Sequence, residues 1–346
     1  MTVIWFILPL LYFLFNKMSA KNEQKFSLLF LFFLIVISGM RDWTKMDNDS
    51  YNYYTWFDYG ESYLLTNNVE RGYALLNLFI INHSLSFQWV LMIMSILSLS
   101  FIYLALHNLK LNTALGLMVW VLLTYYFYSF NAMRQLTADS ILLLAYSYLQ
   151  RKKLIPYIII VLGATLFHKT AIVALGLLVF YFKDIKISEK VFAITLISTL
   201  FLGTTSVAKT ITGYLASFSD KYEVSAVYGY IDSVSVSKIA MTIFYIYLYH
   251  HANKSNVIFK IVFVGIAVFN FVAFSVGTMR LAYTFLVCQT LLLTHLDLEE
   301  KYEKKRKQLT AISAGYLIFV YYYFLTSNIS DVLNYHMSPI SNIIGV

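Results

Sequence analysis

The topology of this chain depends on residues 154–182, LIPYIIIVLGATLFHKTAIVALGLLVFYF, an apolar stretch interrupted near its middle by His168 and Lys169. A single tilted helix over this stretch would carry the lysines at 183, 186 and 190 to the side opposite the other basic loops. Short loops rich in Lys and Arg stay on the cytoplasmic side of a membrane. The charge pattern therefore predicts two half-length segments that break at His168 and leave this histidine at the outer face.

Further apolar runs continue on both sides of this stretch. The twelve predicted membrane segments are residues 1–16, 26–40, 87–106, 112–130, 134–149, 154–167, 170–182, 191–206, 236–249, 256–275, 279–295 and 308–326. The first run has no basic residue before it and Lys17 after it, which reverses the charge order of a cleavable signal and favours a retained helix. We expect an all-α, polytopic integral membrane helix bundle of about 12 transmembrane segments, one domain over residues 1–346, with both termini outside.

The composition is that of a membrane protein. Hydrophobic residues make up 59% of the 346 and charged residues 13%, which excludes an ordinary soluble domain. Most of the net charge of +8 lies in predicted inner loops, so no nucleic-acid partner is expected. Cys288 is the only cysteine and no HExxH or similar ligand set occurs, so neither a metal site nor a cofactor is predicted.

Two predicted outer loops are long. Residues 41–71 are polar and aromatic, residues 205–235 are rich in Tyr, Ser and Gly, and residues 72–83 are expected to form a short helix along the surface. The outer side also receives a small set of charged residues: Asp47, Asp49, Glu70, Arg71, Arg134, His168 and Arg280. These residues are too few to set the topology, so we interpret them as a candidate reaction centre.

Arg134 and Arg280 each open a predicted membrane segment at its outer end. A helix N-terminus favours anions through its free amides and its dipole, and arginine adds a planar fork that matches phosphate oxygens. A purely topological role would place arginine on the inner side. Both residues are therefore candidates for contact with a phosphate or diphosphate.

His168 is the first candidate for a general base, because histidine exchanges protons near neutral pH and ionisable groups at membrane depth are usually functional. Asp47 and Glu70 remain alternatives for that role. Asp47-Asn48-Asp49 resembles a metal-binding DxD element of soluble glycosyltransferases, but an external loop does not meet the cytoplasmic nucleotide sugars. Asp49 and the neighbouring Tyr51 suit the hydroxyls of a carbohydrate instead.

Five motifs follow one another in an order that is more specific than any one of them. They are Asp47 to Tyr51, Glu70-Arg71-Gly72-Tyr73, Asn131 to Gln135, Phe167-His168-Lys169-Thr170-Ala171 and Arg280-Leu281-Ala282-Tyr283. In this order they resemble the EpsG family, which groups with the Wzy-type polysaccharide polymerases of bacterial envelopes. The resemblance covers nearly the whole chain, from the second membrane segment to Tyr283.

The resemblance implies a metal-independent glycosyltransferase of the bacterial cytoplasmic (inner) membrane. It would join oligosaccharide repeat units carried on undecaprenyl diphosphate at the outer face, and so build exopolysaccharide, capsule or O-antigen. The growing chain would be transferred from its lipid diphosphate to a new lipid-linked unit. The implied partners are this lipid-linked oligosaccharide, membrane lipids and other polysaccharide-export proteins.

The residue pattern and the resemblance to the EpsG family predict the same division of roles. The leaving lipid diphosphate develops negative charge, which preorganised arginines stabilise without a metal. We expect Arg134 and Arg280 to do this, and His168, Asp47 or Glu70 to take the proton of the attacking hydroxyl. The predicted substrate-binding residues are Arg71, Lys169, Asp49, Tyr51, Tyr73 and Tyr283.

Two other functions remain open at this point. A flippase or transporter of lipid-linked oligosaccharide needs the same anion contacts, but its charged residues should continue to the inner face. A glycosyltransferase that uses polyprenyl-phosphate sugars also places acids on its first large outer loop, and it transfers single sugars rather than blocks.

Overall fold

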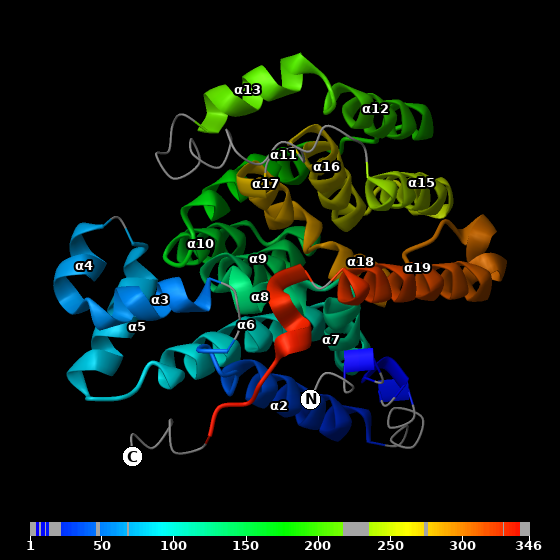
Figure 1. The fold of residues 1–346 in the computed structure, drawn as a ribbon. Coiled ribbons are helices and arrows are strands. Elements are labelled where there is room, and N and C mark those ends of the chain that lie inside the picture. The colour runs from blue at the N-terminus through cyan, green and yellow to red at the C-terminus, as the bar shows by residue number, and fades with distance from the viewer. Residues whose placement is uncertain are drawn as a thin grey trace. The chain divides into compact units, whose positions relative to one another are not determined.

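The fold is helical, as predicted. The computed structural model describes residues 5–6, 8–10, 12–13, 22–45, 49–67, 69–216, 235–272, 276–327 and 329–339 (Figure 1). Within these ranges the extended backbone forms two isolated bridges, Arg41 with Met337 and Ala252 with Leu298, and no β-strand. Both ends of the chain, residues 1–4 and 340–346, lie outside these ranges, so their predicted placement outside the membrane stays a prediction.

The chain divides into two compact units. Unit 1 comprises residues 1–148, 155–172 and 317–346, and unit 2 comprises residues 149–154 and 173–316. That these units together form one integral membrane domain stays a prediction.

Unit 1 holds the first half of the helices. Its elements are α2 (Glu23–Gly39), α3 (Ser50–Asp58), α4 (Gly60–Thr66), α5 (Arg71–Asn82), α6 (Gln88–Asn108), α7 (Thr113–Leu122), α8 (Tyr125–Asn131), most of α9 (Met133–Gln150) and α10 (Leu154–Thr165), the start of η1 (Lys169–Leu178), the second half of α19 (Arg306–Thr326) and η3 (Ile329–Asn334). Helix α2 packs against α6 and α7. The helix predicted over residues 72–83 is confirmed as α5, and the stretch 41–71, predicted as an outer loop, contains two helices, α3 and α4.

Unit 2 is built around one apolar helix. Its elements are α11 (Val179–Phe182), α12 (Glu189–Leu202), α13 (Ser206–Ala216), α15 (Val236–His251), α16 (Val257–Val272), α17 (Val276–Leu286), α18 (Gln289–Thr294), η2 (Glu300–Lys305) and the first half of α19. Helix α16 packs against α12, α15, α17 and α18. The start of the second predicted outer loop is helical, as α13, and residues 217–234 of that loop lie outside the described ranges.

Few of the described helices are long enough to cross a membrane unbent. Residues 88–108 and 300–326 qualify by length and composition, and two bent pairs, α7 with α8 and α12 with α13, raise the number to four. The bend of 61° between α7 and α8 follows Thr124, which has a φ of 68°, a left-handed conformation that few residues other than glycine adopt. A set of twelve spans is therefore not confirmed, and the predicted segment 112–130 is broken.

The break predicted at His168 is confirmed. Helix α10 ends at Thr165 and the helical segment η1 begins at Lys169. Two backbone bonds form the turn between them, from His168 N to Ala164 O at 3.1 Å and from Ala171 N to His168 O at 3.1 Å. The turn presents His168 where two half-length helices meet.

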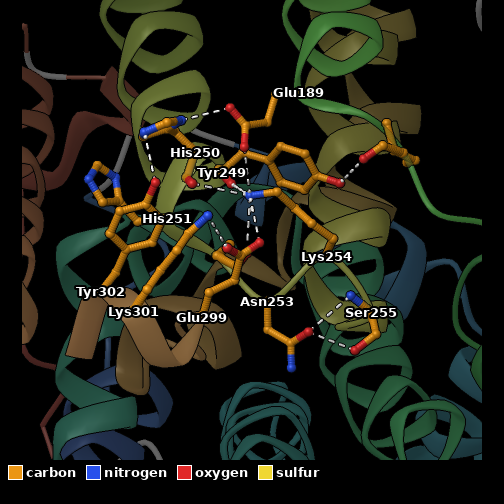
Figure 2. Close-up of polar contacts among 12 residues, drawn as sticks. Glu189, Tyr249, His250, His251, Asn253, Lys254, Ser255, Glu299, Lys301 and Tyr302 are labelled. Carbon is orange, nitrogen blue, oxygen red and sulfur yellow. Dashed lines mark hydrogen bonds and ion pairs between the residues drawn. The ribbon is translucent and has the colours of Figure 1, made fainter.

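Loops that the sequence assigns to the inner side meet at one end of unit 2 (Figure 2). Lys254 Nζ lies 3.4 Å from a carboxylate oxygen of Glu189 and 3.5 Å from one of Glu299. The ring of His250 bonds Glu189 at 2.7 Å on one side and the Tyr302 hydroxyl at 3.2 Å on the other. The segments before α12, after α15 and around η2 therefore lie together in unit 2, and the prediction that they face the inner side stays a prediction.

Candidate functional site

Three of the predicted site residues come together in unit 1. Glu70 precedes α5, Arg134 lies in the first turn of α9, and His168 occupies the turn between α10 and η1. The Arg134 guanidinium donates from Nη1 to Oε2 of Glu70, and the other carboxylate oxygen of Glu70 lies 3.3 Å from Nδ1 of His168. The side chain of Glu70 is 9% exposed and the other two are 12% exposed. One nearly buried carboxylate thus holds two basic side chains.

A close backbone contact brings two of these segments together. The N–H of Gly72 donates to the carbonyl of Leu166 at 2.8 Å. A Cβ atom on Gly72 would lie 2.8 Å from that oxygen, closer than real Cβ atoms come, so this position requires glycine. The contact docks the first turn of α5 on the end of α10, and it sets Glu70 beside His168.

Aromatic rings enclose the guanidinium of Arg134. Its central carbon lies 4.6 Å from the ring centre of Trp56, 5.5 Å from that of Tyr53 and 5.7 Å from that of Tyr73. Cations within about 6 Å of an aromatic face are attracted to it. Trp56 and Tyr53 belong to α3, one turn apart, and Tyr73 belongs to α5. Arg134 is therefore fixed both by a carboxylate and by the rings of α3 and α5.

The surroundings keep Glu70 ionised. Burial by itself raises the pKa of a carboxyl group, but the contact with His168 and the charge of Arg134 outweigh burial and lower the pKa of Glu70 to about 2. A carboxylate with so low a pKa is a weak proton acceptor at neutral pH. Both ring nitrogens of His168 are buried and make no hydrogen bond to the described residues.

A cleft of about 650 Å³ opens beside Glu70. Arg71 and Lys169 supply two positive charges to its wall, and Thr165 supplies a hydroxyl. The remaining lining is apolar: Leu64, Leu65, Val69, Ala74, Leu75 and Leu166. Of these, Leu65 is 59% exposed, Leu75 64% and Leu166 48%. The cleft therefore combines a cationic part with an exposed leucine wall, which suits an amphiphile with an anionic head group.

Asp49 and Tyr51 lie at the start of α3. The backbone N–H of Asp49 donates to Oδ1 of Asn131 at 2.8 Å, and the Ser50 hydroxyl donates to the carbonyl of Phe130 at 3.1 Å. These bonds attach the loop to the segment that leads into α9. Tyr51 is 64% exposed, and Asp47 lies outside the described residues.

Arg280 and Tyr283 belong to unit 2, so their position relative to the three residues above stays a prediction. Both lie on α17, which begins at Val276. The sequence predicted that Arg280 opens its membrane segment. In the structure it lies one turn inside the helix.

Two features of this site could not be assigned from the sequence. The pairing of Arg134 with Glu70 joins residues 64 positions apart, and the aromatic rings of Tyr53 and Trp56 lie about 80 positions from the guanidinium that they enclose. The spacing of three residues between these two rings was the available signal, because residues i and i+3 share a helix face.

Within the described ranges no group of three or more His, Cys, Asp or Glu side chains could hold a metal ion.

Comparison with protein families matches residues 24–339 of the chain to the EpsG family. No curated protein and no solved structure matches the chain. The match begins near the start of α2 and extends beyond η3, so it includes Glu70, Arg134 and His168 as well as Arg280.

Proposed function

Because this chain belongs to the EpsG family, whose known role is that of a Wzy-type polysaccharide polymerase, we propose that it is a glycosyltransferase of the bacterial cytoplasmic membrane. It polymerises oligosaccharide repeat units carried on undecaprenyl diphosphate, at the outer face. The product is an exopolysaccharide, a capsule or an O-antigen chain.

The observation that carries this proposal is the pairing of His168 with an ionised Glu70 beside a cationic, leucine-walled cleft. Glycosyl transfer from a lipid diphosphate needs a base for the acceptor hydroxyl, cations for the leaving diphosphate and an apolar surface for the polyprenyl chain. Unit 1 offers each of these within one region. A purely structural membrane protein gives no reason for a buried base next to an open cleft.

In the proposed reaction the acceptor hydroxyl gives its proton to Nε2 of His168 as its oxygen bonds to the anomeric carbon of the donor. The bond between that carbon and the diphosphate oxygen breaks, and its electron pair leaves with undecaprenyl diphosphate. Glu70 stabilises the imidazolium that forms, because a fixed carboxylate next to a histidine favours its charged state. Glu70 thereby acts through His168 and is no longer our alternative for the base.

Separate cations take the charge of the leaving group. Arg71 and Lys169 line the cleft and are in reach of a bound head group, while Arg134 is engaged by Glu70 and the surrounding rings. We therefore assign Arg71 and Lys169 to the diphosphate, and Arg134 to holding Glu70 in place. Arg280 remains a second candidate for contact with a diphosphate, from unit 2. Charge stabilisation of this kind is commonly the largest single contribution to catalysis.

Purified protein incubated with synthetic undecaprenyl-diphosphate repeat units tests the proposal. The expected result is a ladder of lipid-linked products that differ by whole repeat units, together with released undecaprenyl diphosphate. A polyprenyl-phosphate sugar transferase would extend an acceptor by one sugar only, and would need the monophosphate donor. A flippase in vesicles would move the units across the bilayer without any change in their length.

A further inference from the structure

Tyr59, Tyr63 and Trp56 form an aromatic row across the turn between α3 and α4. The rings of Tyr59 and Tyr63 lie one helical turn apart with their centres 5.3 Å from each other. Tyr63 in turn stacks on Trp56, with the ring centres 6.3 Å apart and an angle of 24° between the ring planes. Gly60 turns the chain between the two helices in a left-handed conformation, with a φ of 69°, and so allows rings of α3 and α4 to meet.

One end of this row meets the group that contains the proposed base. The central carbon of the Arg134 guanidinium lies 4.6 Å from the ring centre of Trp56. Arg134 donates to Glu70, whose other carboxylate oxygen lies 3.3 Å from Nδ1 of His168. All of these residues belong to unit 1. A ligand that lies along the row is therefore beside the group of Arg134, Glu70 and His168.

The other end of the row is exposed and has polar neighbours. Tyr59 is 60% exposed, and Asp58, Glu61 and Ser62 beside it are exposed as well. The face of an aromatic ring carries partial negative charge, which attracts C–H groups with their small positive charge. A sugar has C–H groups on the faces of its ring and hydroxyl groups at its edge. Exposed rings with polar side chains around them therefore match a carbohydrate.

Helix α4 presents a different surface to the cleft. Leu65 lines the cleft together with Arg71 and Lys169, and it follows Tyr63 by about 200° around the helix. The cleft is thus aliphatic and cationic, whereas the row is aromatic and its exposed ionisable neighbours are acidic. Carboxylates accept hydrogen bonds from hydroxyl groups and repel phosphate. The charge distribution therefore favours phosphate in the cleft and hydroxyl groups on the row.

We propose that the aromatic row is the subsite for the glycan of the lipid-linked repeat unit, and that Tyr59 and Tyr63 hold its sugars by stacking. This inference rests on the proposed function, which assigns the cleft to the lipid diphosphate. The lipid-diphosphate part of a substrate occupies the cleft and its sugars occupy the row. The two parts of the substrate thus bind to separate surfaces, and each can be measured with its own probe.

The affinity of the purified full-length protein for the repeat-unit oligosaccharide, freed of its lipid diphosphate, tests this subsite. Calorimetry measures this affinity without any need for polymerisation. Tyr59→Ala should weaken binding about tenfold, and Tyr59→Phe, which keeps the ring, should retain most of the affinity. Tyr59→Leu should behave like the alanine variant, because an aliphatic side chain has no π face. Tyr214→Ala removes a tyrosine of α13 that is 66% exposed and should bind like the wild type.

Undecaprenyl diphosphate without sugars is the matched probe for the cleft. Its affinity should be unchanged in Tyr59→Ala and should fall in Arg71→Gln, which removes a cation of the cleft wall. The oligosaccharide should show the reverse pattern in these two variants.

Several results would overturn the subsite. They are the absence of oligosaccharide binding to the wild-type protein, an unchanged affinity in Tyr59→Ala, and the loss of both probes in that variant. Full affinity in Tyr59→Leu would mean that Tyr59 is only an apolar surface residue, as aromatic residues are at membrane interfaces. Failure of the proposed function looks different. A protein that binds the oligosaccharide on the row but makes no product from lipid-linked units keeps the subsite and is not a polymerase.

Discussion

Oε1 of Glu70 lies 3.3 Å from Nδ1 of His168, and the same carboxylate accepts a hydrogen bond from Arg134. In our proposal this arrangement separates the roles of His168 and Glu70, which the sequence had left as alternatives for the general base. The carboxylate is kept ionised by its neighbours, and we propose that the far nitrogen of the imidazole takes the proton. The following predictions depend on this separation.

His168→Ala should stop bond formation without preventing the display of substrate. Removing a general base lowers a reaction rate by about 10²- to 10⁴-fold, and alanine should not alter the topology. In cells that make the polymer, single undecaprenyl-diphosphate repeat units should accumulate and be cleaved by an externally added glycosidase. Units that stay protected from the glycosidase would indicate a transporter, and polymer of normal length would remove His168 from the mechanism.

Glu70→Gln should change the dependence of stability on pH. The folded-state pKa of Glu70, about 2, lies below the ordinary value of 4.5, so its contribution is fully present above pH 4.5 and is lost as the pH falls toward 2. The contribution is on the order of 3 kcal/mol. The difference in unfolding midpoint between wild type and Glu70→Gln should be constant near neutral pH and narrow below 4.5. A difference that is unchanged at pH 3 would contradict the coupling.

Arg134→Lys should lose most polymerisation at an unchanged protein level in the membrane. A lysine keeps the charge, but it cannot reproduce the planar contact with Trp56 and Tyr53 while it also holds Glu70. Arg280→Lys should lose activity for the separate reason that an ammonium cannot form a bidentate contact with phosphate. The length of the polymer on gels measures the activity of both variants. Near-normal length in both variants would exclude these two arginines from the reaction.

Gly72→Ala should weaken the contact that sets Glu70 beside His168. The added methyl group would lie 2.8 Å from the Leu166 carbonyl, and overpacking of this kind destabilises by about 1–3 kcal/mol. Gly163→Ala is the matched control, because a Cβ there meets no atom within 4 Å and alanine is the better helix former. We expect polymerisation to fall in the first variant and to persist in the second. Equal activity in both would show that the close contact is not needed.

The topology can be tested with single cysteines, because the native Cys288 is buried. A membrane-impermeant thiol reagent should label cysteine at Asn67 or Ser327 from outside and should not label it at Asn22, Ser188 or Gln308. Ser188 adjoins Glu189 of the network in Figure 2, so its side should be that of Lys254 and Tyr302. Labelling at Ser188 from outside would invert the second half of the chain.

The break at His168 was predictable because its cause is local. The lysines that follow residues 154–182 indicate that this stretch ends on the inner side, and charge in short loops can be interpreted without any tertiary contact. The helix after Glu70 was predictable in the same way, from the residues of that segment alone. The bend between α7 and α8 was not predictable, because it arises at Thr124, whose left-handed backbone conformation leaves no trace in the hydropathy of the sequence.

The sequence by itself determined a helical membrane protein of the EpsG family and singled out the charged residues that we expect at the outer face. Only the tertiary structure decided which of them meet and that Arg134 is engaged by Glu70. Composition and charge act on each segment separately, so they can be read along the chain. The partner of a side chain depends instead on how distant segments dock, as the Gly72 backbone does on Leu166.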